Sequence, residues 1–554
     1  MNADNGYQDY ILSKRDILPI VSLILLSLVV IFFALDSTTI WNTDEARYAR
    51  VSKEMLESGN LIQPQLWGKP YYNKPPLMDW LIILSTFLFG GFSEFSVRFP
   101  SAVFGTACVM VTYLLGKIFF NRLLAFFGAV ILLTTFGFNT PARFCKADMV
   151  MVFFMTLSLY TFALWYFKKG ASKEHFSPWL FYVPLGLAVL AKGPQAIVLC
   201  PLVIFIFLLL MRDLSSIKNM RPLLSILILS IVILPWYVAG FIVSGQEFVN
   251  EIGNYFKREN FDMFAGEKPI HYQPWYYYFG QFSVQQIPWL LFLPSALFAM
   301  FYLKAKENRR RFIFLLVWFL SIFIFFSIAG AKRHYYLLPL YPSVSLLVAL
   351  FFECFPLDRK TVLSRLFMAL PFLLILIPSL FYIMFPDIIN SRLTKSVRPY
   401  TELIFTVAII LAILSTGLLS LTLIGRIKTS FVIVVTIMVI LHIVYAGYYE
   451  QRLTDKEGPD GIRFCRKVAE IIKGETVYFY KFDKTYFAYY IDKTTPLISR
   501  DDILNNIYAG KKMFIMLPEG RYNNDNILKD NFNVLLDEKP YTGGSILLIK
   551  SRYD

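Results

Sequence analysis

The chain contains 554 residues, of which 56% are hydrophobic and 17% aromatic, and it carries a formal net charge of +15. This is more apolar side chain than a soluble core could bury, so the composition excludes an ordinary soluble protein. The basic residues lie between apolar runs and the five cysteines lie far apart, which argues against a nucleic-acid-binding domain, a disulfide framework and a cysteine-bound metal cluster.

Apolar runs recur along most of the chain. Runs of about 18 or more residues with almost no charge, such as 17–35, 222–243 and 401–424, can span roughly 30 Å of hydrocarbon as helices. Counting such runs predicts an α-helical polytopic membrane protein with about thirteen transmembrane helices. The first run follows two basic residues and is too long for a signal peptide, so we expect it to be retained.

The run at 77–90 is too short for a span, and we expect it to lie as a helix at the outer membrane interface. With that placement, every loop on one side of the membrane carries basic residues, and the positive-inside rule places that side in the cytoplasm. These residues are Lys14 and Arg15; Arg122; Lys168, Lys169 and Lys173; Arg212, Lys218 and Arg221; Lys304, Lys306, Arg309, Arg310 and Arg311; Arg359, Lys360 and Arg365; and Arg426 and Lys428.

Three larger segments then lie outside the cytoplasm, at about 36–98, at about 244–285 and after residue 449. We therefore expect a membrane domain over residues 1–449 and a separate domain over residues 450–554. The tail combines an amphipathic stretch with alternating runs that are typical of strands, which predicts a small extracytoplasmic α/β domain. The amphipathic stretch is 460–472, and the strand-like runs are 476–480, 512–517, 533–536 and 545–549.

The strongest group of polar residues follows the first span. The segment 41–50 places the carboxylates of Asp44 and Glu45 where a lipid head group would lie. Carboxylates in the first turn of a helix also suit the helix dipole, so a purely structural role at the helix start is the simpler alternative. The two roles are compatible, because a helix start holds a carboxylate rigidly.

A turn rich in aromatic and basic residues follows at 68–77. It contains Tyr71, Tyr72 and Lys74, and two prolines fix the backbone directly after the lysine. A positioned lysine at the membrane surface suits phosphate recognition, although contact with ordinary lipid head groups is the more common role. The tyrosines fit contact with a sugar or isoprene units, or membership of the interfacial aromatic belt.

Further polar residues lie at the outer ends of later spans. Asp148 stands at the mouth of a span shortly after Arg143, and a structural ion pair between them is the alternative to a role in a binding site. Lys332 and Arg333 lie on the outer side, where basic residues are disfavoured, which indicates anion binding.

These motifs, in this order, resemble those of the bacterial aminoarabinose transferases and protein-mannosyltransferase-like glycosyltransferases of the GT-C superfamily. The resemblance covers about residues 17–350 and is specific for the superfamily, but not for a substrate within it. It rests on Thr43-Asp44-Glu45-Ala46-Arg47-Tyr48, Lys74-Pro75-Pro76-Leu77, Val97-Arg98-Phe99-Pro100-Ser101, Arg143 with Asp148, Lys192-Gly193-Pro194, Glu259-Asn260, Pro274-Trp275-Tyr276-Tyr277-Tyr278 and Lys332-Arg333-His334-Tyr335-Tyr336-Leu337-Leu338-Pro339.

The resemblance implies an external active site that transfers a sugar, with inversion, from a polyprenyl phosphate such as undecaprenyl phosphate. Such a transfer needs one group that stabilises the departing phosphate and another that orients or deprotonates the acceptor, and Lys74 and Asp44 fit these roles. The candidate catalytic residues are Asp44, Glu45 and Asp148. The candidates for binding the donor phosphate or lipid are Lys74, Tyr71, Tyr72, Arg47, Arg143, Arg258, Lys332, Arg333 and Tyr335.

Two positions depart from the family pattern. An acidic residue usually precedes the lysine of the turn, where this chain has Asn73, and a family arginine is replaced by Met263. Arg258 and Lys257 are the candidates to supply the missing charge. The first departure removes a carboxylate ligand, and His271 and His334 are only weak metal candidates without it, so neither a metal nor another cofactor is expected.

The sequence thus predicts a multi-pass enzyme of the bacterial inner membrane with a periplasmic C-terminal domain. Its expected partners are a polyprenyl-phosphate sugar and an envelope acceptor such as lipid A or lipopolysaccharide. Whether Asp44 deprotonates a hydroxyl or only orients an acceptor stays open, since a phosphate acceptor needs no base. A protein or glycan O-glycosyltransferase of the same superfamily is the alternative. A lipid or sugar transporter is more remote, because ionisable residues are scarce at the centres of the spans.

Overall fold

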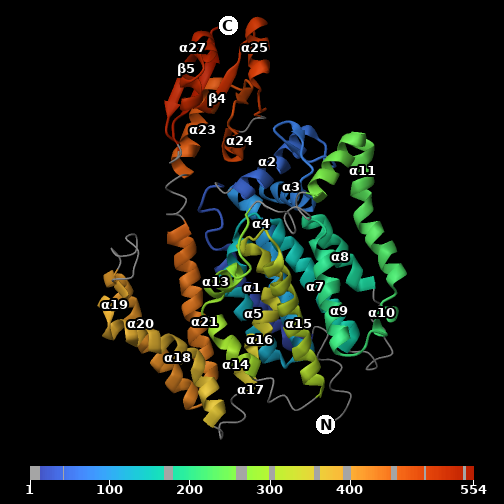
Figure 1. Ribbon diagram of the computed structural model, residues 1–554, viewed down its shortest axis with the longest axis vertical. Coiled ribbons are helices and arrows are strands. Elements are labelled where there is room, and N and C mark those ends of the chain that lie inside the picture. The colour runs from blue at the N-terminus through green and yellow to red at the C-terminus, as the bar shows by residue number, and fades with distance from the viewer. Residues whose placement is uncertain are drawn as a thin grey trace.

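The protein consists mainly of helices, arranged as a bundle that carries a smaller domain of helices and strands at one end (Figure 1). A computed structural model describes residues 13–40, 43–167, 179–257, 271–298, 306–354, 362–390, 401–450, 458–491, 495–540 and 544–553.

Eight helices in the described residues are long and apolar enough to cross a membrane. The count becomes nine if α5 (Arg122–Leu133) and α6 (Phe136–Arg143), which are bent by 62°, form one broken span. The eight are α1 (Ile17–Ser27) with η3 (Leu28–Phe32), α4 (Glu94–Phe119), α7 (Ala147–Phe167), α11 (Pro222–Phe256), α15 (Lys306–Ile328), α18 (Val362–Met384), α20 (Thr401–Leu423) and α21 (Ile427–Val444) with η10 (Tyr445–Tyr449).

The other predicted spans correspond to shorter apolar helices. By length and composition these helices do not qualify as spans, so the figure of about thirteen crossings remains a prediction. They are α8 (Trp179–Lys192), α9 (Gln195–Leu210), η5 (Trp289–Phe292) with α14 (Leu293–Phe298), and η7 (His334–Leu340) with α16 (Tyr341–Ala349) and α17 (Phe351–Cys354); α10 (Ser216–Asn219), α13 (Tyr277–Gln286) and α19 (Pro386–Asn390) connect longer elements.

Large apolar side chains lie on the outward faces of the bundle as well as in its core. On α11 and α20, large side chains such as Leu223, Ile242 and Ile413 are more than 60% exposed. Such surfaces are unfavourable in water and suit contact with lipid, while the helices satisfy their own backbone hydrogen bonds. The predicted fold class, a polytopic α-helical membrane protein, is therefore confirmed.

The segment between the first two spans folds into α2 (Thr43–Ser58), a hairpin of β1 (Gln65–Leu66) and β2 (Lys69–Pro70), and α3 (Leu77–Phe89). Trp67 and Gly68 form the turn of the hairpin with positive φ angles of 63° and 71°. Their N–H groups donate to the Glu54 carboxylate at 3.1 and 2.9 Å, which ties the hairpin to α2. This anchoring fixes the chain directly before the turn that carries Lys74.

The C-terminal domain contains a four-stranded sheet in the order β3-β4-β6-β5, in which only β3 and β4 are parallel. The strand-like runs predicted from the sequence each overlap one of these strands, and the amphipathic stretch lies in α23. The elements are α23 (Gly458–Ile472), β3 (Val477–Phe479), α24 (Thr485–Ile491), α25 (Arg500–Tyr508), β4 (Phe514–Pro518), α26 (Glu519–Asn523), α27 (Asn526–Asn531), β5 (Phe532–Glu538) and β6 (Ile546–Ser551).

This domain lies at the same end of the bundle as α2 and α3 (Figure 1). The Tyr490 hydroxyl accepts a hydrogen bond from the Ile40 N–H at 2.8 Å and donates to Glu94 at 2.6 Å. The ring of Trp67 packs against that of Phe479, with centroids 5.4 Å apart. The C-terminal domain is therefore docked on the segment that builds the site.

Candidate active site

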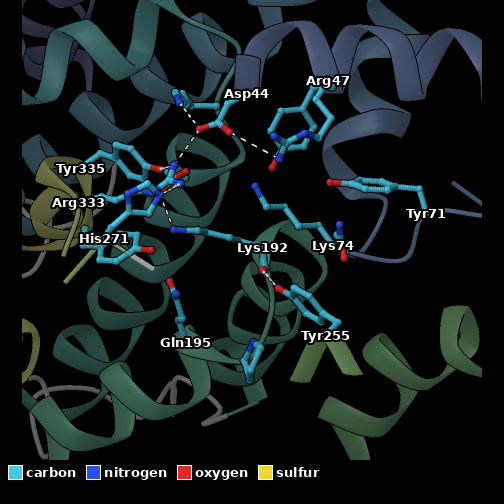
Figure 2. Close-up of a pocket in the computed structure, with 16 residues that line it drawn as sticks. Asp44, Arg47, Tyr71, Lys74, Lys192, Gln195, Tyr255, His271, Arg333 and Tyr335 are labelled. Atoms are coloured by element: carbon cyan, nitrogen blue, oxygen red, sulfur yellow. Dashed lines mark hydrogen bonds and ion pairs between the residues drawn. The ribbon is translucent and has the colours of Figure 1, made fainter. Parts of the chain in front are cut away.

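A pocket of about 160 Å³ lies where α2, the turn before α3 and the ends of α7, α8 and η7 meet. Figure 2 shows the side chains of Asp44, Arg47 and Lys74 pointing into it from one wall, and Arg333 and Tyr335 from another. Its lining residues are Asp44, Arg47, Tyr48, Tyr71, Asn73, Lys74, Lys146, Asp148, Lys192, Pro194, Gln195, Tyr255, His271, Arg333, Tyr335 and Tyr336.

Positive charge dominates the lining. Two carboxylates face five basic side chains, each of which lies in a helix end or an adjoining loop. Clustered cations with aromatic neighbours suit a phosphate-bearing ligand, because ammonium and guanidinium groups make strong charge-assisted hydrogen bonds to phosphate. The five cations are Arg47, Lys74, Lys146, Lys192 and Arg333.

Asp44, in the first turn of α2, is the centre of an ion-pair network. Its carboxylate lies 3.0 Å from Lys146 Nζ, 3.4 Å from Arg333 Nη1 and 3.7 Å from Arg47 Nη1. Burial alone would raise the pKa of Asp44, but the charges of Lys146 and Lys74 outweigh it and hold the pKa well below its usual range. The Asp44 carboxylate is therefore ionised at neutral pH and can orient the basic side chains around it.

Asp148 and Lys192, which both line the pocket, form a second, buried pair, with Lys192 Nζ 2.5 Å from the carboxylate. Lys192 is the last residue of α8, and Gly193 reverses the chain with a φ of +119° before α9 begins. A Cβ at Gly193 would lie only 3.1 Å from the Tyr255 hydroxyl, which itself donates to the Lys192 carbonyl. Asp148 thus lines the pocket as predicted, and its ion-pair partner is Lys192 instead of Arg143, the partner considered in the structural alternative.

Lys74 is the basic residue best placed to receive a ligand. Its ammonium lies 4.8 Å from the centroid of the Tyr48 ring, and it makes no ion pair with a carboxylate in the part of the chain that the structure describes. Burial lowers the pKa of Lys74 to about 8, although Asp148 and Asp44 partly offset the effect. An anion entering the pocket would supply the missing partner.

Arg333 reaches the pocket from the loop before η7. It donates to the Tyr335 hydroxyl at 2.5 Å and lies 2.6 Å from His271 Nε2, besides contacting Asp44. Its neighbour Lys332 turns away and donates to the carbonyls of Gln273 and Ala329. Arg333 and Tyr335 therefore line the pocket as predicted. Lys332 lies outside the lining and connects its own loop to the loop before α13.

Glu45 also lies outside the pocket, against the expectation of a catalytic role. Arg98 grips both of its oxygens at 2.8 and 3.0 Å, and the Cys145 N–H donates to it at 2.9 Å. With all three groups buried, these bonds leave the carboxylate no free face for a substrate. Glu45 instead fastens α2 to α4 and to the chain before α7.

Two predicted ligand-binding residues are likewise structural. Arg143 pairs with Glu450 at 2.8 Å and donates to the carbonyls of Ile31 and Phe33, both at 2.7 Å, so it joins α6 to the ends of η3 and α21. Tyr72 is buried against Phe248, and its hydroxyl bonds to Ser244 at 2.6 Å. Neither side chain lines the pocket, and Arg258 lies outside the described residues.

Several lining residues were not predicted. Lys146 lies two residues before Asp148, and Lys192 lies in a motif already quoted. A basic residue at the end of a span was the feature of the sequence that could have identified both. Tyr48 likewise lies in a quoted motif, whereas Tyr255 and Gln195 gave no such signal, because tyrosine is common at any interface and a single glutamine has no pattern.

The histidines do not form a metal centre in the described residues. His271 lines the pocket, but its Nε2 faces the Arg333 guanidinium, while His334 lies outside the lining. Among the residues described, no group of three or more histidine, cysteine, aspartate or glutamate side chains is placed to hold a metal ion. The sequence-based expectation of a metal-free enzyme stays a prediction.

The apolar helices and the cation-rich pocket at the helix ends define a polytopic α-helical membrane protein. Solved structures share this fold. ArnT from Cupriavidus metallidurans, solved in the apo state and bound to undecaprenyl phosphate, matches with TM-scores of 0.73 and 0.72 at 18% identity, over 96% of this chain and 97% of that one. The archaeal oligosaccharyltransferase AglB from Archaeoglobus fulgidus matches with a TM-score of 0.52 at 12% identity, over 98% of this chain and 75% of that one.

Sequence comparisons confirm the predicted resemblance. Residues 21–245 match the family model of dolichyl-phosphate-mannose-protein mannosyltransferases. An uncharacterized protein of Aquifex aeolicus (strain VF5) is 33% identical over 62% of this chain and 65% of its own length. Undecaprenyl phosphate-alpha-4-amino-4-deoxy-L-arabinose arabinosyl transferase 2 of Proteus mirabilis (strain HI4320) is 30% identical over 57% of this chain and 56% of its own length. The chain is thus similar to these transferases and spans between half and two thirds of the length of these two curated relatives.

Proposed function

We propose that this protein is an inner-membrane glycosyltransferase that moves a sugar from a polyprenyl phosphate to an envelope acceptor on the periplasmic side. The observation that carries the proposal is the pocket in which five cations face two carboxylates beside the short apolar helix α3. A lipid-linked phosphate would meet such a site at the membrane surface. Relatives named as undecaprenyl phosphate-dependent arabinosyl transferases support this donor class.

In this proposal Lys74 binds the donor phosphate. Its side chain is half-buried and lacks a carboxylate partner within the described chain, so the phosphate charge would compensate the partial loss of water around the ammonium. As the bond between the anomeric carbon and the phosphate oxygen breaks, polyprenyl phosphate leaves with the bonding electron pair. The same cation then stabilises the charge that develops on the phosphate, which lowers the barrier to transfer.

Asp44 suits an orienting role better than that of a proton acceptor. A strong general base needs a pKa near the working pH, whereas the charges of Lys146 and Lys74 hold the pKa of Asp44 well below its usual range. A phosphate acceptor is already a nucleophile and requires no base. The site therefore favours an anionic acceptor such as a phosphate of lipid A, which Arg333 and Lys146 would help to position.

A second candidate is protein O-glycosylation. Residues 21–245 match a family model of protein mannosyltransferases, which use the same kind of lipid-linked donor. In both candidate functions the pocket would bind the donor in the same way. In the second one the acceptor would be a serine or threonine hydroxyl, which needs deprotonation. The low pKa of Asp44 makes this candidate the less favoured one.

Comparison of a deletion strain with its parent by mass spectrometry of lipid A, envelope glycans and envelope proteins tests the proposal. We expect the deletion strain to lose one sugar modification of an envelope lipid, and a plasmid copy of the gene to restore it. A plasmid copy encoding Lys74→Met, expressed at the same level, should fail to restore it. Loss of a protein-linked sugar instead would favour the second candidate, and no change in any of these fractions under conditions of confirmed expression would contradict both.

A further inference from the structure

A second, smaller cavity lies beside the pocket. It shares five lining residues with the pocket and adds Val51, Pro64 and Asp79. Its volume of about 20 Å³ is too small for a sugar, but it exceeds the roughly 10–15 Å³ that a single water molecule requires. The shared residues are Asp44, Arg47, Tyr48, Tyr71 and Lys74.

Three polar groups in this cavity stand out. The Tyr48 hydroxyl is buried and has no hydrogen-bond partner in the described chain. Asp79 of α3 is 3% exposed, and its Oδ1 accepts a hydrogen bond from the Ser52 hydroxyl at 3.0 Å. Lys74 lies over the Tyr48 ring. Buried polar groups are rarely left without a hydrogen bond, so we expect a further polar partner in this cavity besides the described side chains.

We propose that one ordered water occupies this cavity and joins Asp79 and the Tyr48 hydroxyl to Lys74, which makes Asp79 a positioning residue for the lysine. The inference rests on the proposed function, because that function assigns Lys74 to the donor phosphate. A water with these partners would make about three hydrogen bonds, the usual number for buried water. It would also satisfy the Tyr48 hydroxyl.

The charges of Asp79 and Lys74 are linked. Burial raises the pKa of Asp79 to about 7, and burial lowers the pKa of Lys74 to about 8. Because Lys74 lowers the pKa of Asp79, ionised Asp79 must raise the pKa of Lys74 through the same interaction. The other charged groups that act on Lys74 are Asp148 and Asp44, which raise its pKa, and Lys192 and Lys146, which lower it; Arg47 and Tyr71 line the same cavity.

The linkage predicts a specific pH dependence. Below about pH 7 Asp79 is largely neutral and gives Lys74 little support. Above about pH 7 its negative charge helps to keep Lys74 protonated, until the lysine itself loses its proton above about pH 8. Removing the Asp79 carboxylate should therefore change the charge of Lys74, and with it the affinity for an anion, least at low pH and most above neutrality.

The test measures binding of a prenyl methyl phosphodiester to the full-length protein in lipid nanodiscs between pH 6 and pH 9. The single negative charge of this probe is constant over the range, so the pH dependence belongs to the protein. Wild-type affinity should fall above about pH 8 as Lys74 loses its charge. For Asp79→Asn the fall should begin roughly half to one pH unit lower, while the difference from wild type should be smallest at pH 6.

Two further variants isolate the coupling. Lys74→Arg keeps its charge at pH 9, so it should abolish the fall, and adding Asp79→Asn to Lys74→Arg should produce no shift. Ser52→Ala retains the Asp79 carboxyl but removes its hydrogen bond. That carboxyl should then ionise at a higher pH, and the affinity curve should shift in the same direction as for Asp79→Asn, by less.

The outcomes separate this inference from the proposed function. Superimposable curves for wild type and a folded Asp79→Asn, or an equal loss of affinity at every pH, would overturn the inference alone. If Asp79→Asn does not fold, an unshifted curve for Ser52→Ala overturns it. Failure of the phosphodiester to bind wild type at any pH would contradict the proposed function itself.

Discussion

Asp44 and Glu45 are adjacent in the first turn of α2, yet the fold gives them opposite environments. Asp44 faces the pocket and is surrounded by cations that also line it and that a ligand can contact. Glu45 points into the bundle, where Arg98 and a backbone N–H occupy its oxygens. Successive helical residues point about 100° apart, so one carboxylate of the pair can serve the site while the other holds the helix in place.

Substitution of these two neighbours should therefore have different effects. Asp44→Asn should fold normally and lower the transfer rate by roughly 10²-fold, because an orienting anion is lost. Glu45→Ala should lower the free energy of unfolding by about 3–5 kcal/mol, because it leaves the Arg98 guanidinium buried without its partner. Thermal unfolding in detergent and single-turnover transfer assays measure the two effects.

The control for the Asp44 and Glu45 variants is Asp460→Asn, which changes an exposed carboxylate of α23 outside the pocket. It should alter neither the transfer rate nor the free energy of unfolding. A Glu45→Ala protein as stable as wild type but inactive would return Glu45 to the catalytic residues. Full activity of Asp44→Asn would remove Asp44 from them.

At the scale of elements, the sequence predicted what local patterns determine. Alternation of apolar residues located the strands of the C-terminal domain, and the prolines after Lys74 indicated a rigid turn before α3. What the sequence could not show is which distant segments meet. Arg143 and Glu450 are 307 positions apart, and nothing in either local pattern indicates that they pair.

The same limit explains why some of the predicted site residues lie outside the pocket. Arg143, Lys332 and Tyr72 had the residue types expected of ligand-binding groups, but each is used to join elements that are remote in the sequence. Lys146 was overlooked because a single lysine beside a span resembles an ordinary interfacial residue. Residue type and membrane depth can be read from the sequence, whereas the direction of a side chain depends on tertiary packing.

At the scale of the whole molecule, the docked C-terminal domain and the pocket share one end of the bundle (Figure 1). We predict that this end faces the periplasm, because the thirteen crossings predicted from the sequence, starting at a basic cytoplasmic N-terminus, would end outside. Cys465 is a poor reporter of that location, because its side chain is fully buried. An introduced cysteine at Tyr508, whose side chain is 85% exposed, avoids the difficulty.

Tyr508→Cys should react with a membrane-impermeant maleimide in cells whose outer membrane has been permeabilised. Asn219→Cys is the matched control, because this exposed residue lies in a basic loop predicted to face the cytoplasm, and it should react only after the inner membrane is opened. Reaction of both cysteines only in opened cells would contradict a periplasmic C-terminal domain.

Transfer by the purified protein shows whether the cation-rich pocket moves a sugar from a polyprenyl phosphate. Wild-type protein in nanodiscs would be given radiolabelled undecaprenyl phosphate-linked aminoarabinose, the donor named for its relatives, together with lipid A. We expect label on lipid A and release of undecaprenyl phosphate in equal amounts, with neither product formed by Lys74→Met. Failure of the folded wild-type protein to bind or consume this donor or other undecaprenyl phosphate sugars, or undiminished transfer by Lys74→Met, would contradict it.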